Sequence, residues 1–117
     1  MSAIAYTKIL KMDVESAINK IRPLLKEIGF GVLTRIDFDQ KIKEKLNKDM
    51  NKTVILGVCN PLLAHEAYKQ NTDVALLIPR NLVITQKNSN ECSLELMKPK
   101  QMINFLPNVK IDDLLVP

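Results

Sequence analysis

The chain has 117 residues, of which 46% are hydrophobic and 26% charged. This composition is typical of a folded globular protein and excludes a disordered chain. The net charge of +4 favours acidic partners only weakly. No apolar run is long enough for a signal peptide or a membrane span, so we expect no membrane partner. Cys59 and Cys92 lie far apart without a framework spacing, which predicts free thiols and a cytoplasmic location.

The first third of the chain predicts a strand, a helix and a second strand. Residues 4–10 alternate loosely and include Tyr, Thr and Ile, which favours a strand. Asp13 can cap a helix whose apolar residues recur at helical spacing, and Gly29 suits its end. Residues 30–38 alternate again and predict the second strand.

The middle of the chain predicts a short helix and a buried strand. A lysine-rich helix is expected to begin at Asp39 and to point Ile42 and Leu46 inward. Residues 53–59 are apolar throughout, which indicates a central strand covered on both faces. Asn60 as a cap and Pro61 at the first helical position then open another helix.

The rest of the chain predicts extended segments and a hairpin. Residues 74–78 and 82–87 are expected to be extended, with a bend at Pro79. A polar turn follows, and residues 92–97 alternate as the returning strand of a hairpin. A short helix is expected at residues 101–106.

Three segments carry a resemblance to a known family. They are FGVLTRID at residues 30–37, ILGVCNPLLA at residues 55–64 and LLIPRNLV at residues 76–83. In order and spacing they resemble the family of the domain of unknown function DUF302. The resemblance implies one α+β domain over residues 1–117, with two layers, a mainly antiparallel sheet, helices on one face and a topology like that of the TATA-binding protein. It also implies homodimers, but no activity.

The chain departs from the family pattern in two places. Relatives often have cysteine where this chain has Arg80, which weakens a mechanism with two thiols. Relatives also tend to continue into a longer C-terminal helix, whereas this sequence stops at Pro117. We therefore expect a shortened C-terminal segment, or a partner chain in its place.

The corner after the central strand is the candidate ligand site. Gly57 and Cys59 share one face of the strand, and Gly57 has no side chain, which predicts space beside the sulfur. The helix that begins after Asn60 offers unpaired amides and a dipole that favour an anion or a thiolate. Arg80 and Asn81 join this site if the family pattern holds. The predicted ligand-binding residues are therefore Gly57, Cys59, Asn60, Arg80 and Asn81.

Several functions stay open at this stage. A homodimer that binds a small molecule or anion is the first hypothesis. The second is thiol-dependent redox chemistry or sulfur transfer through Cys59, which would make that residue catalytic. The third is a protein–protein interaction module. For Cys59 itself, a structural role as a buried residue is the leading interpretation, ahead of ligand contact and thiol chemistry. Whether the protein is an enzyme is therefore left open.

The sequence predicts no metal and no cofactor. His65 is the only histidine, and a zinc site needs three or four convergent ligands. We expect His65 to lie on the surface, where the neighbouring Leu62 favours contact with another subunit. Nucleic acid is not an expected partner either, because stacking aromatic residues are scarce.

Overall fold

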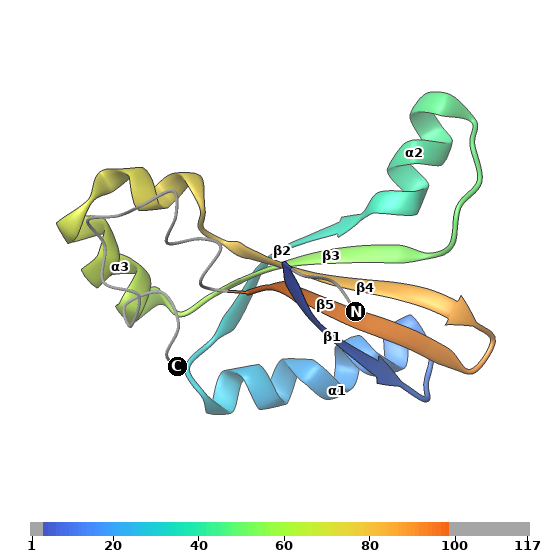
Figure 1. The fold of residues 1–117 in the computed structure, drawn as a ribbon, viewed down its shortest axis with the longest axis horizontal. Coiled ribbons are helices and arrows are strands. Elements are labelled where there is room, and N and C mark those ends of the chain that lie inside the picture. The colour runs from blue at the N-terminus through green and yellow to red at the C-terminus, as the bar shows by residue number, and fades with distance from the viewer. Residues whose placement is uncertain (1–3, 99–117) are drawn as a thin grey trace.

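The structure is a computed structural model that describes residues 4–98. Its elements follow in the order β1 (Ala5–Leu10), α1 (Val14–Glu27), β2 (Gly31–Asp37), α2 (Phe38–Leu46), β3 (Thr53–Cys59), α3 (Pro61–Gln70), the 3₁₀ helix η1 (Thr72–Leu76), β4 (Arg80–Asn88) and β5 (Glu91–Met97) (Figure 1). The predicted α+β class is confirmed. The helix expected at residues 101–106 lies outside the described residues.

The five strands form one antiparallel sheet in the order β1-β5-β4-β3-β2. β3 lies between β4 and β2, and every residue of it is buried except the half-buried Ile55. β4 and β5 form the predicted hairpin, in whose turn the Asn90 amide donates to Asn88 Oδ1 at 2.9 Å. β1 pairs with β5, so the N-terminal strand completes the far edge of the sheet.

Helix α1 covers one face of the sheet (Figure 1). Asp13 caps it as predicted, because its carboxylate accepts a hydrogen bond of 2.7 Å from the Ser16 amide. Gly29 follows the helix with a φ of +86°, the left-handed conformation that glycine adopts without strain. The core lies between this helix and the sheet and is formed by Val14, Ala17, Ile18, Val54, Leu56, Val58, Leu82, Ile84 and Cys92.

Helices α2 and α3 extend past opposite ends of the sheet instead of covering a face (Figure 1). Ile42 is half-buried, but the prediction that Leu46 points inward is wrong, since its side chain is 61% exposed. The spacing of these two residues does predict a helix, and the helix forms. It projects beyond the strands, however, so the end of its apolar face has no surface to pack against.

Residues 74–78 were expected to be extended, and this prediction is wrong. Thr72–Leu76 forms a 3₁₀ helix instead, begun by Asn71, whose Oδ1 accepts a hydrogen bond of 2.9 Å from the Asp73 amide. Val74 is buried against Ala67 of α3 in a small second cluster. A short apolar run does not distinguish a strand from a buried helical turn, and here the cap decides the conformation.

Candidate functional site

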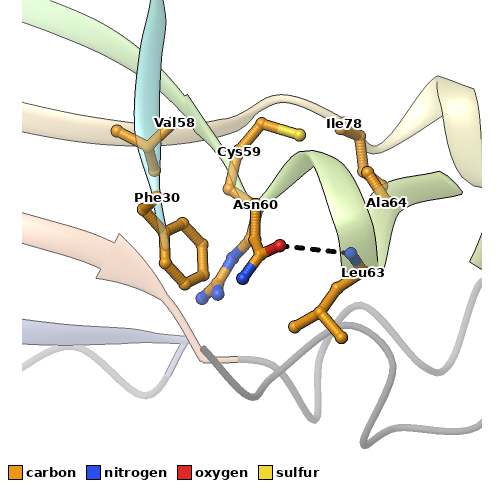
Figure 2. Close-up of a pocket in the computed structure, with 8 residues that line it drawn as sticks. Phe30, Val58, Cys59, Asn60, Leu63, Ala64 and Ile78 are labelled. Carbon is orange, nitrogen blue, oxygen red and sulfur yellow. Dashed lines mark hydrogen bonds between the residues drawn. The ribbon is translucent and has the colours of Figure 1, made fainter. Parts of the chain in front are cut away.

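The corner between β3 and α3 is built by a helix cap. Asn60 has an extended backbone, and its Oδ1 accepts a hydrogen bond of 3.1 Å from the Leu63 amide (Figure 2). Pro61 is the first residue of α3, where its missing N–H leaves no bond unmade. The predicted helix start is confirmed. This corner places Cys59, the last residue of β3, directly before the N-terminus of α3.

A small cavity, called the inner cavity here, lies at this corner. It is lined by Phe30, Val58, Cys59, Asn60, Leu63, Ala64, Ile78 and Arg80, and its volume is about 20 Å³. That space holds about one water molecule. Cys59 is only 7% exposed, and its sulfur points to the side of Ile78 and Ala64 (Figure 2). Burial raises the pKa of the Cys59 thiol above its ordinary value, which disfavours the reactive thiolate.

Gly57 does not border the inner cavity. A Cβ atom on this residue would lie 2.9 Å from Pro79 Cγ and closer still to Thr34 Oγ1. The space that Gly57 was predicted to leave beside the sulfur is therefore filled by the protein itself. Strand alternation correctly places Gly57 and Cys59 on one face of β3. It does not show which side chains of neighbouring segments pack onto that face.

Arg80 reaches the inner cavity from the start of β4, where it lies opposite Val58. Its Nε is buried and has no hydrogen-bond partner within residues 4–98. Its Nη2 donates one long hydrogen bond, 3.3 Å, to the Met97 carbonyl oxygen. No carboxylate of the described residues forms an ion pair with it. Burial lowers the pKa of the half-buried Arg80 guanidinium, and no described residue compensates its lost solvation with an ion pair.

A second and larger hollow, called the outer cavity here, shares Arg80 with the inner one. Its volume is about 220 Å³, and its lining residues are Leu76, Leu77, Pro79, Arg80, Asn81, Leu96 and Met97. Within the described part of the chain, Arg80 is the only ionic side chain in this lining and Asn81 the only amide. The leucines and Met97 were missed by sequence reasoning, because η1 was not predicted and nothing local places it beside the end of β5.

The remaining candidate residues lie apart from both cavities or on the surface. His65 is exposed on α3, and Leu62 beside it is 72% exposed, as predicted. Across residues 4–98, no group of three His, Cys, Asp or Glu side chains is placed to hold a metal ion. Over the same residues, no helix is both long and apolar enough to cross a bilayer.

These observations define a small α+β protein with one helix-covered antiparallel sheet and a site at the adjoining ends of β3 and β4. Residues 6–116 match the family described as domain of unknown function DUF302, and the chain belongs to that family. The predicted resemblance is confirmed. A similar crystal structure, that of the uncharacterized conserved protein DUF302 from Bacillus stearothermophilus, has a TM-score of 0.82 and 28% identity, covering 91% of this chain and 82% of that chain. None of the curated proteins matches.

Proposed function

We propose that this protein is a cytoplasmic homodimer that binds a small molecule or anion beside Arg80. Cys59 and Asn60 line the inner cavity with Arg80, and Asn81 lines the outer one. The observation that carries the proposal is the buried Nε of Arg80, which has no partner within residues 4–98. Gly57 acts indirectly, since its missing side chain lets β4 begin close to β3.

A desolvated guanidinium favours an anionic partner for a simple reason. Removing a charge from water is costly unless an opposite charge and hydrogen bonds replace the lost solvation. Arg80 makes one long hydrogen bond to a neutral carbonyl, which replaces little of it. A carboxylate or phosphate would satisfy several N–H groups at once, in the planar geometry that arginine favours.

Thermal denaturation with a panel of anions tests this proposal. An anion present at 100 times its Kd should stabilise the folded state by about 2.7 kcal/mol. The Arg80→Met variant should lose this stabilisation. Arg22→Met is the matched control, because Arg22 is an exposed arginine on α1. If no anion stabilises the protein, or if both variants respond like the parent, binding at Arg80 is wrong.

The homodimer is supported by the open face of the sheet. In Figure 1, α1 lies along one face and no other described helix lies along the opposite face. Ile9 and Ile36, on the open side, are 50% and 43% exposed. One row crosses all five strands on this side and contains a single charged residue, Glu95; its members are Thr7, Glu95, Val83, Ile55 and Ile36. A sheet face with so little charge is typical of a surface that a partner covers.

Sedimentation velocity tests the dimer and its surface. Ile36→Lys should produce monomers, because it places a charge on the covered face. Leu62→Lys on α3 is the control. If only this variant dissociates into monomers, the interface lies at α3 and not on the sheet. The cytoplasmic location is supported by Cys59 and Cys92, which are both free thiols.

A further inference from the structure

The two cavities at Arg80 differ too much in size to hold the same ligand. The inner cavity of about 20 Å³ has room for about one water molecule. The outer cavity of about 220 Å³ lies somewhat below the usual range for drug-sized ligands, roughly 300–1,000 Å³. A ligand larger than water must therefore lie in the outer cavity and reach Arg80 from that side.

The described wall of the outer cavity is mostly apolar. Leu76 is the last residue of η1 and Leu77 follows it, while Leu96 and Met97 lie at the end of β5. Leu76 is 83% exposed and Met97 is 43% exposed, so apolar side chains border this hollow without being covered. Burying them against a ligand would be favourable, because removing apolar surface from water lowers the free energy.

Of the described residues that line the outer cavity, Arg80 is the only charged one. Arg80 contributes the full positive charge, and Asn81, which is exposed, contributes a neutral amide. Among residues 4–98, no acidic side chain lines this cavity. A ligand that complements this wall therefore carries a negative head group at one end and an apolar body at the other.

We infer that the ligand is a small amphiphilic anion, whose carboxylate or phosphate head pairs with Arg80 and whose short aliphatic body lies against Leu76, Leu77, Leu96 and Met97. This inference rests on the proposed function and names the chemical class of its ligand. Asn81 adds a hydrogen bond at the head group. The apolar residues set specificity, since an inorganic anion cannot contact them.

A homologous series of alkanoates, from acetate to decanoate, tests the inference by titration calorimetry on the full chain. Each added methylene should tighten binding roughly fourfold until the cavity is full, and the gain should then stop. Octanol and octylammonium, which lack the negative head, should bind weakly. Octyl phosphate compared with octanoate shows which head group is preferred.

Two variants locate the head and the body of the ligand. Arg80→Met should weaken octanoate about 10- to 100-fold, the range expected when a charged hydrogen-bond partner is lost. Leu76→Ser should reduce the gain in affinity per added methylene. The substitution should leave the fold intact, because Leu76 is 83% exposed. Leu24→Ser is the matched control, an exposed leucine on α1, and should bind like the parent.

The outcomes separate this inference from the proposed function. If acetate and octanoate bind equally well and Arg80→Met abolishes the binding of both, the inference of an amphiphilic ligand is wrong. The proposal of anion binding at Arg80 is then still supported. If no alkanoate or phosphate binds, or if Arg80→Met binds octanoate like the parent, both are wrong. If octanol binds as tightly as octanoate, the negative head is unnecessary and the inference is overturned.

Discussion

Arg35 and Glu15 face each other in a two-bond pair, with Nη1 to Oε1 at 3.0 Å and Nη2 to Oε2 at 2.6 Å. Arg35 also contacts Asp37 at 2.9 Å, and Lys52 reaches Glu15 at 2.9 Å. The four charges join the first turn of α1 to β2 and to the residue before β3. They hold the covering helix against the sheet at the end opposite α3.

This network should make the protein sensitive to acid. The hydrogen bonds from Arg35 and then from Lys52 lower the pKa of Glu15 from 4.5 to about 2. A depressed pKa stabilises the folded state above pH 4.5, and this contribution is lost as the pH falls toward 2. Glu15→Gln should remove about 1 kcal/mol at pH 6 and flatten the acid slope, a modest amount because the pair is partly exposed.

Urea denaturation at several pH values between 2 and 6 measures this effect. The free energy of unfolding of Glu15→Gln should still depend somewhat on pH, because the Ser16 backbone hydrogen bond also lowers the pKa of Asp13. Glu66→Gln is the control, since Glu66 forms a single exposed pair with Lys69 at 3.2 Å. An unchanged slope in Glu15→Gln would contradict the assignment.

Gly57→Ala should destabilise the protein by about 1–3 kcal/mol, the usual cost of an overpacked core. The added Cβ would lie 2.9 Å from the ring of Pro79 and would also collide with Thr34. Gly31→Ala is a matched control, because a Cβ there meets no atom within 4 Å. Chemical denaturation of the two variants measures the difference, and equal stabilities would show that the β4 start can move away.

Much of the fold was predictable because its signals are local. Asp13 and Asn60 cap helices through their own side chains, and the apolar stretch at Thr53–Cys59 encodes a buried strand by composition alone. The hairpin likewise depends on turn residues that are neighbours in sequence. Each of these elements could be predicted without knowledge of the rest of the chain.

The parts that were missed depend on contacts between distant segments. Leu46 has the spacing of a buried residue, but α2 extends past the sheet. Gly57 lies on the same face of β3 as Cys59, but Thr34 of β2 and Pro79 fill the space beside it. Arg80 was assigned to the site only through the family resemblance, and the cavity it shares with η1 required the three-dimensional structure.

Asn60→Asp separates the structural role of this residue from a role in binding. The carboxylate can still accept from the Leu63 amide, and a negative charge suits a helix N-terminus, so stability should change little. The new charge lies in the same cavity as Arg80, however, and should compete with an anionic ligand. We expect affinity to fall roughly tenfold, as measured by calorimetry. Asn60→Ser is the control, because it keeps the cap without the charge.

Cys59 should react slowly with alkylating reagents in the folded protein. It is 7% exposed, so the reagent has little access to its sulfur. Burial also raises the pKa of its thiol above the ordinary 9.0, so the fraction present as thiolate is reduced. Iodoacetamide labelling near pH 7.5, followed by peptide mass spectrometry, should be roughly tenfold slower or more than in denatured protein. Cys92, which is fully buried, is the internal control. Labelling of Cys59 faster than that of a simple peptide thiol would instead support thiol-dependent redox chemistry or sulfur transfer at this corner.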